Sequence, residues 1–160
     1  ISILCSLIFQ MNILLFFGIF KLVTDYLAHY LKQITKYLYK LYGNDVIPIL
    51  GLGKRPLGAK HCGCFVYENG DGLSKSFGMP SGHSIIAVTT CVILLWYIMK
   101  KYPKSTHSLI SIISLILITL CVLHSRTSLN CHTLNQVIVG SLIGLLFGYI
   151  GIKLFKKLNI

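Results

Sequence analysis

Four long runs of apolar residues constrain this chain more than any other feature of its sequence. They cover residues 1–20, 85–99, 109–123 and 137–155. A helix needs about 20 apolar residues to cross roughly 30 Å of hydrocarbon, and the first and last runs approach that length. The two middle runs are shorter and need flanking Ser, Thr and Tyr residues at the interface. Because a secretory signal has one short apolar region at its N-terminus, four runs predict membrane spans instead.

The composition also indicates a membrane protein built of helices. Hydrophobic residues make up 54% of the chain and charged residues 12%, which is too apolar for an ordinary soluble domain. We therefore predict an all-α fold, a polytopic transmembrane bundle of four to five helices that forms a single membrane-embedded domain over residues 1–160. The first residue is Ile1 and not methionine, so we expect that an upstream piece of the protein is missing.

The net charge of +11 is distributed in a way that favours the positive-inside rule over nucleic-acid binding. If the last three spans alternate in direction, one end of the bundle is rich in lysine and is predicted to be cytoplasmic. The lysines of that end are Lys100, Lys101, Lys104, Lys153, Lys156 and Lys157. Basic residues at the opposite end suggest an anionic ligand there. These are Lys54, Arg55, Lys60, Lys75 and Arg126.

Between the first two apolar runs, a helical pattern gives way to a loop. Residues 20–42 carry apolar and aromatic side chains at helical spacing, with lysines on another face. This pattern predicts either one helix that leaves the membrane near Lys32 or two helices separated by a bend. Residues 43–82 are rich in glycine and hold most of the acidic residues, so they predict an extramembrane functional loop. At the end of this loop, Ser81 is a good N-cap for the next helix.

Alternating spans bring several polar residues to one face of the membrane. His83 begins one span, Arg126 ends the next, and His132 begins the last, so all three are expected at the same end. Arg55 can reach them from the loop. The last run also carries glycines at four-residue spacing, which predicts a surface for close helix packing. These glycines are Gly140, Gly144 and Gly148.

The six cysteines do not predict a disulfide framework. Three lie inside apolar runs and fit as small core residues. These are Cys5, Cys91 and Cys121. His61, Cys62 and Cys64 lie close together but match no zinc-site spacing. Cys131 is interpreted as a neighbour of His132 and not as a participant in chemistry. We therefore expect no metal ion and no other cofactor.

Two short motifs resemble a known family. The run Pro80-Ser81-Gly82-His83 is followed about forty residues later by Ser125-Arg126 and then by His132. This arrangement resembles the second and third signatures of the type 2 phosphatidic acid phosphatase superfamily, and Arg55-Pro56 resembles the end of its first signature. The resemblance implies a six-helix membrane fold, of which this chain would hold the last four helices, and a phosphatase with no metal requirement.

A finer resemblance points to one branch of that family. The segment from His132 to Val137, together with Met79 before the proline, looks most like the polyisoprenyl (dolichyl-type) diphosphate phosphatases. The family resemblance also implies the chemistry. His132 would be the nucleophile that forms a phosphohistidine, and His83 the general acid that protonates the leaving group. The groups that would bind the phosphoryl oxygens are Arg55, Arg126, Ser81 and Gly82.

Two positions depart from the family pattern. The first signature normally has a lysine seven residues before its arginine, where this chain has Pro48. Either Lys32, at the end of a helical segment, or Lys54, beside Arg55, could take its place. Most members have an aspartate four residues after the nucleophile, one helical turn on. Gln136 stands there instead, and it can accept a hydrogen bond from the imidazole but adds no negative charge.

The sequence therefore predicts an integral membrane phosphatase that hydrolyses a lipid-linked phosphate or diphosphate. The expected substrate is a phospholipid or a polyisoprenyl (di)phosphate within the membrane lipid, and no nucleic acid partner is expected. The active site, including loop 43–82, is predicted on the lumenal or extracytoplasmic face. Two alternatives stay open: a lipid phosphotransferase that uses the same site, and a catalytically weak membrane protein that retains the anion site.

Overall fold

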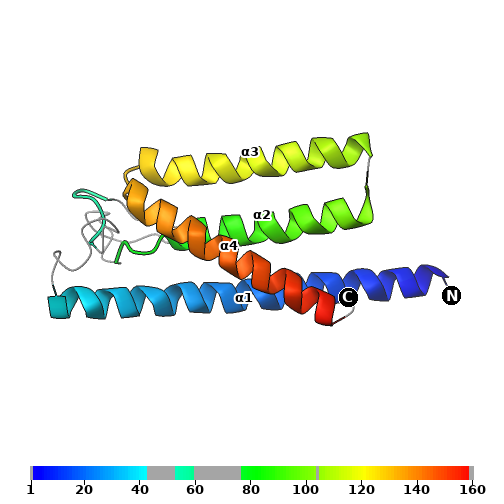
Figure 1. Ribbon diagram of the computed structural model, residues 1–160, viewed down its shortest axis with the longest axis horizontal. Helices are drawn as coiled ribbons and strands as arrows, with labels where there is room; N and C mark the ends of the chain where they lie inside the picture. Colours follow the sequence, from blue (N-terminus) through cyan, green and yellow to red (C-terminus); the bar gives the residue numbers. More distant parts are fainter. Residues whose placement is uncertain (1, 43–52, 60–76, 104, 159–160) are drawn as a thin grey trace, which may run out of the picture.

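The computed structural model describes residues 2–42, 53–59, 77–103 and 105–158, and this part of the chain is a bundle of helices (Figure 1). The helices are α1 (Ser2–Tyr42), α2 (Gly82–Lys101), α3 (Thr106–Ser128) and α4 (Leu134–Lys157). Three of them, α2 to α4, are long and apolar enough to cross a membrane. The described residues contain no strand, so the prediction of an all-α polytopic bundle is confirmed.

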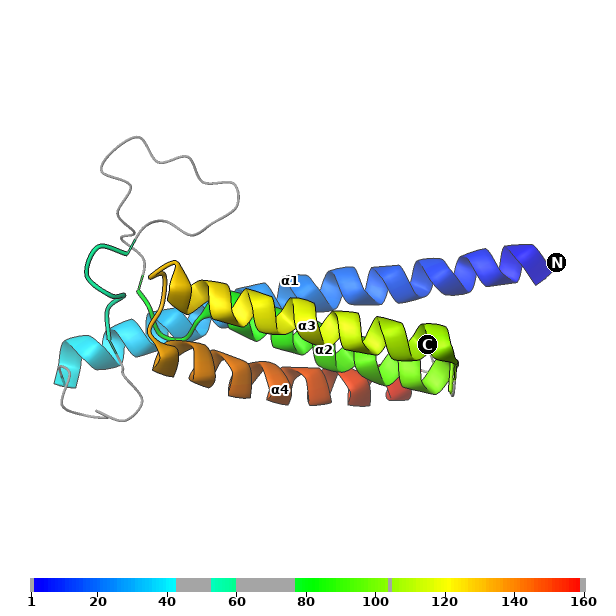
Figure 2. The ribbon, with the colours of Figure 1, turned by 90° about the horizontal axis from the view of Figure 1, so that it is seen from above.

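Helix α1 is continuous over 41 residues, so the alternative of two helices separated by a bend is wrong. At 1.5 Å per residue it is about 60 Å long, roughly twice the thickness of the hydrocarbon layer. Its last turns, beyond Lys32, extend past the start of α2 (Figure 2). Thr24 and Ala28 are buried along the C-terminal half of the helix. Further on, the Thr35 hydroxyl donates a hydrogen bond of 2.6 Å to the carbonyl of Met79, just before α2.

Helix α2 is the central helix and packs against the three others. Its closest neighbour is α4, which crosses it diagonally in Figure 1. The predicted glycine stripe makes this approach possible: a Cβ at Gly144 would lie 2.8 Å from the carbonyl oxygen of Ile85, and one at Gly140 would lie 2.6 Å from that of Ser81. The Thr89 hydroxyl donates to the Gly144 carbonyl at 3.1 Å across the same interface. The predicted role of these glycines in packing is confirmed.

Helix α3 packs mainly against α2 and leaves most of its apolar surface exposed. The large exposed side chains on it include Leu109, Ile110, Ile113, Leu117, Ile118 and Leu120. Such a surface is unfavourable in water by about 25 cal/mol for each Å² of apolar area. In a bilayer the same surface faces lipid, as expected for a helix of a membrane protein.

The two ends of the bundle differ in character. At one end, aromatic rings and lysines gather where α2 and α4 terminate: the Nζ atoms of Lys100 and Lys156 lie 5.1 Å and 5.6 Å from the Trp96 ring centre. Lys104, predicted for the same end, lies outside the described residues. At the other end lie segment 53–59, the start of α2 and the turn from α3 to α4.

Candidate active site

The first component of the site is the start of α2, which begins at Gly82 with Ser81 as its N-cap, as predicted. The Ser81 side chain is fully buried and accepts hydrogen bonds from the Ser84 hydroxyl at 2.8 Å and the Ser84 amide at 3.4 Å. The amides of Gly82 and His83 belong to the first turn, where no intrahelical carbonyl can accept them. The helix therefore presents two backbone donors to an anion, and the His83 side chain is exposed beside them.

The second component is the turn between α3 and α4. The carbonyl of Arg126 accepts hydrogen bonds from the amides of Cys131 at 3.0 Å and His132 at 2.9 Å. Asn130 makes this reversal with a φ of 53°, in the left-handed region that asparagine tolerates better than most residues. As a result, His132 folds back over the end of α3, and it lies before α4 instead of opening it as predicted. The reason is that Thr133 is the N-cap of α4.

A glutamine fixes the orientation of the His132 ring. His132 is 3% exposed and Gln136 is 1% exposed. The Gln136 amide nitrogen donates to the carbonyls of Gly53 at 3.3 Å and Lys54 at 3.0 Å, so its oxygen must face the opposite way. That oxygen accepts from the Thr133 amide at 3.2 Å and lies 3.0 Å from Nδ1 of His132. Because an amide oxygen can only accept, Nδ1 carries the hydrogen and Nε2 keeps its lone pair.

Gln136 also connects α4 to the residues before α2. Its backbone carbonyl accepts a hydrogen bond from the amide of Ser81 at 3.1 Å. Gly78 packs against its side chain so closely that a Cβ there would lie 2.5 Å from Nε2 and 2.7 Å from Oε1. The glutamine is therefore enclosed on several sides, and its contacts tie together the loop, the start of α2 and the start of α4.

Arg55 reaches the site from segment 53–59. Its Nη1 donates a hydrogen bond of 2.9 Å to the carbonyl of Cys131, next to His132. The segment is further held by Asn130, whose side-chain amide donates to the carbonyl of Leu57 at 3.2 Å. Burial, followed by the charge of Arg126, lowers the pKa of Arg55 from its ordinary value. The two guanidinium groups are therefore close enough to repel each other, which favours an anion between them.

The structure places Lys32, and not the side chain of Lys54, beside these groups. A Cβ at Gly82 would lie 3.9 Å from both Cε and Nζ of Lys32. Burial, followed by the charge of Arg55, lowers the pKa of Lys32 to about 8. The Lys54 ammonium instead lies 5.9 Å from the centre of the Tyr39 ring, and Lys54 contributes its carbonyl to Gln136. The Pro48 position lies outside the described residues.

The electrostatics of the site favour a neutral imidazole and an anionic ligand. Burial, followed by the charge of Arg55, lowers the pKa of His132 to about 3, although its hydrogen bond to Gln136 acts in the opposite direction. His132 is therefore a neutral imidazole at neutral pH. Lys32, Arg55 and Arg126 all interact with the exposed His83. A phosphoryl group bound here would offset the repulsion among these cations.

Three contributors to this arrangement were not predicted from the sequence: Thr35, Gly78 and Thr133. The pattern that could have identified Thr133 is its spacing from Gln136, since a threonine followed three residues later by glutamine is a capping box. Nothing in the sequence indicates the contacts of Thr35 and Gly78, because both are made to residues distant along the chain or enclosed by the fold.

One cysteine makes a bond that was not predicted from the sequence. Cys131 is disulfide-bonded. Cys91 and Cys121 are free. His61, Cys62 and Cys64 lie outside the described residues. Within the part of the chain that is described, no three His, Cys, Asp or Glu side chains are grouped to hold a metal ion.

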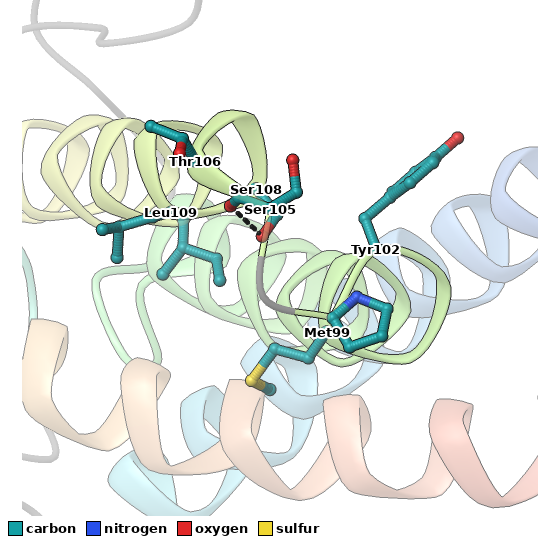
Figure 3. A pocket seen from close by; sticks show the side chains of 8 residues that line it. Met99, Tyr102, Ser105, Thr106, Ser108 and Leu109 are labelled. Atoms are coloured by element: carbon teal, nitrogen blue, oxygen red, sulfur yellow. Dashed lines mark hydrogen bonds between the residues drawn. The ribbon is translucent and has the colours of Figure 1, made fainter.

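A cavity lies at the opposite end of the bundle, where α2 turns into α3 (Figure 3). It has a volume of about 500 Å³ and is lined by residues that include Met99, Tyr102, Ser105 and Leu109. The Ser108 hydroxyl donates to the Ser105 carbonyl at 2.8 Å beside it. None of the described residues that line it is charged, so it lacks the cations that gather around His83 and His132.

Comparison with known families agrees with the geometry of the site. Residues 9–160 match the family described as the PAP2 superfamily. This range includes every residue of the candidate site. The chain belongs to the PAP2 superfamily. The residues that resemble the signatures of this family, from Arg55 to His132, lie together at one end of the bundle.

One curated relative is Dolichyldiphosphatase 1 of Dictyostelium discoideum, which is 35% identical over 79 residues. The match covers 48% of this chain and 34% of the relative, so the chain spans about a third of that protein's length in the alignment. No solved structure matches the chain. The similarity agrees with the branch of the family that the residues from His132 to Val137 resemble.

Proposed function

We propose that the chain is a membrane phosphatase that hydrolyses a lipid-linked phosphate or diphosphate through a phosphohistidine at His132. The observation that carries this proposal is the pairing of His132 with Gln136. Their hydrogen bond of 3.0 Å leaves Nε2 unprotonated, among the cationic groups of Arg55, Arg126 and Lys32. A neutral imidazole with an unprotonated ring nitrogen is a nucleophile, and cations around it stabilise the charge of a phosphoryl group during transfer.

The proposed reaction has two steps. Nε2 of His132 attacks phosphorus, the bond to the leaving oxygen breaks, and the protonated ring of His83 gives its proton to that oxygen. A water molecule then attacks the phosphohistidine, His83 accepts a proton from it, and the bond between phosphorus and Nε2 breaks to release phosphate. Arg55, Arg126, Lys32 and the amides at the start of α2 hold the phosphoryl oxygens in both steps.

A polyisoprenyl diphosphate is the proposed substrate. Support comes from the relative named as a dolichyldiphosphatase and from the residues after His132 that resemble the same branch. We further propose that the site faces the lumenal or extracytoplasmic side. The terminal lysines of α2 and α4 lie at the opposite end of the bundle, and the positive-inside rule makes that end cytoplasmic.

The test is phosphate release by the purified full chain in detergent or liposomes. The substrates are a polyisoprenyl diphosphate, phosphatidate and a sphingoid phosphate, each compared between wild type and His132→Ala. We expect release from the diphosphate by wild type, none by His132→Ala or Arg126→Ala, and unchanged melting of the bundle. Activity of His132→Ala equal to wild type would refute the mechanism. Transfer of phosphate to an added lipid hydroxyl, without free phosphate, would show a phosphotransferase instead.

A further inference from the structure

The structure contains one acidic side chain near the site that the mechanism above does not use. Of the four acidic residues in the sequence, only Asp25 lies among the described residues. Its Oδ2 accepts a hydrogen bond of 2.8 Å from the Lys21 ammonium, one helical turn earlier on α1. Its Oδ1 is buried and has no hydrogen-bond partner among the described residues. A buried carboxylate oxygen without a partner is costly, and it suggests a function for the group.

The packing of α1 on α2 places this carboxylate near His83. The two helices run in opposite directions, because α1 ends and α2 begins at the same end of the bundle (Figures 1 and 2). Lys21 lines a small cavity between the helices together with Ile86 of α2. Eleven residues further along α1, Lys32 lies beside Gly82 at the start of α2. Along α1, Asp25 lies between Lys21 and Lys32. Along α2, His83 lies between Gly82 and Ile86, so the two residues are at similar heights in the bundle.

The helical period puts Asp25 on the side of α1 that faces the site. At 3.6 residues per turn, Lys21, Asp25 and Lys32 fall within one narrow face, at positions i, i+4 and i+11. The Asp25 carboxylate is close enough for its charge to act on the imidazole of His83, although more weakly than the neighbouring cations do. The other charged groups that act on that imidazole are all cations, from three different segments: Arg126 of α3, Lys32 of α1 and Arg55 of segment 53–59.

We propose that Asp25 is a positioning residue for the general acid, whose carboxylate orients the His83 ring and stabilises its protonated form. This inference rests on the proposed function, in which His83 gives a proton to the leaving oxygen. The surrounding cations oppose a proton on His83, and a carboxylate near the ring partly offsets them. Asp25 transfers no proton itself. Loss of the Asp25 carboxylate should slow the reaction most for substrates whose leaving oxygen most needs a proton.

Substrates with different leaving groups test this. The purified full chain would be assayed with farnesyl phosphate, whose alkoxide leaving group requires a proton, and with p-nitrophenyl phosphate, whose phenolate leaves without one. In Asp25→Asn, we expect kcat for farnesyl phosphate to fall about 10- to 100-fold, a part of what general acid catalysis contributes. We expect KM for both substrates, and kcat for p-nitrophenyl phosphate, to stay within about threefold. Asp25→Glu should restore part of the lost kcat.

Lys21→Gln is the matched control, because it removes the other partner of Asp25 and leaves the carboxylate in place. We expect it to keep kcat for both substrates within about threefold of wild type. An equal loss for both substrates in Asp25→Asn, or the same selective loss in Lys21→Gln, would show a structural ion pair and overturn the inference. Unchanged kcat in Asp25→Asn would also overturn it. If wild type releases phosphate from neither substrate, the proposed function itself is wrong and the inference fails with it.

Discussion

A single methyl group added at Gly78 should disable the site without disrupting the bundle. Gly78 lies outside the helices, and a Cβ there would be 2.5 Å from Nε2 and 2.8 Å from Cδ of Gln136. Ordinary contacts between such atoms are about 3.5 Å, so Gly78→Ala requires a displacement of about 1 Å. Gln136 is held on its far side by the carbonyls of Gly53 and Lys54, and the displacement therefore strains several hydrogen bonds at once.

The expected loss of activity follows from the hydrogen bond between Gln136 and His132. A shift of about 1 Å lengthens this 3.0 Å contact beyond hydrogen-bond range, so Nδ1 loses the acceptor that keeps Nε2 unprotonated. A misplacement of about 1 Å in a catalytic arrangement can cost about 100-fold in rate. Overpacking of this kind costs about 1–3 kcal/mol of stability. We therefore expect kcat/KM to fall about 100-fold in Gly78→Ala and its melting temperature to fall moderately.

The assay is phosphate release from a polyisoprenyl diphosphate, with thermal unfolding measured in the same detergent. Gly18→Ala is the matched control, since a Cβ at Gly18 of α1 would meet no atom within 4 Å. It should keep full activity and gain up to about 1 kcal/mol in stability from better helix propensity. Activity of Gly78→Ala within about threefold of wild type would refute the argument that the glutamine must hold the imidazole.

Three further predictions address other parts of the site and the bundle. Because the pKa of Lys32 is lowered to about 8, its ammonium is charged below that pH and is lost as the pH rises through it. Activity should therefore decline above about pH 8, and Lys32→Arg should extend the active range upward in a pH profile. Arg55→Lys should reduce kcat/KM by about 100-fold, because lysine lacks the fork that reaches both the Cys131 carbonyl and a phosphoryl oxygen. Gly144→Leu should destabilise the bundle by about 1–3 kcal/mol or more in thermal unfolding, because a Cβ there already meets Ile85 at 2.8 Å.

The parts of the fold that could be predicted from the sequence are those that depend on short-range pattern. Apolar runs gave the positions of α2, α3 and α4, and the glycine spacing gave the face by which α4 meets α2. The continuity of α1 could not be decided, because residues 20–42 combine apolar, aromatic and lysine positions that suit either a bent or a straight helix. Contacts such as that of Thr35 with Met79 hold this half of α1 against the site.

The site was predictable to a similar extent. Alternating helix direction is enough to bring His83, Arg126 and His132 to one end of the bundle, and the structure places them there together with Arg55. The choice between Lys32 and Lys54 was not decidable, because it depends on how far α1 extends and on which face meets Gly82. The hydrogen bonds of the Gln136 side chain could not be predicted either, because its partners Gly53 and Lys54 are more than 80 residues away along the chain.

The glutamine at position 136 has a physical consequence for the ligand that this site favours. A carboxylate there would add a negative charge beside His132 and partly neutralise Arg55, whose charge acts on the same ring. With Gln136 the imidazole is oriented by a neutral group, and α4 adds no acidic side chain beside Lys32, Arg55 and Arg126. A site of this kind gains most from a ligand with several negative charges. This supports our proposal of a diphosphate. The one carboxylate among the described residues, Asp25, acts on His83, which needs a proton for its proposed role.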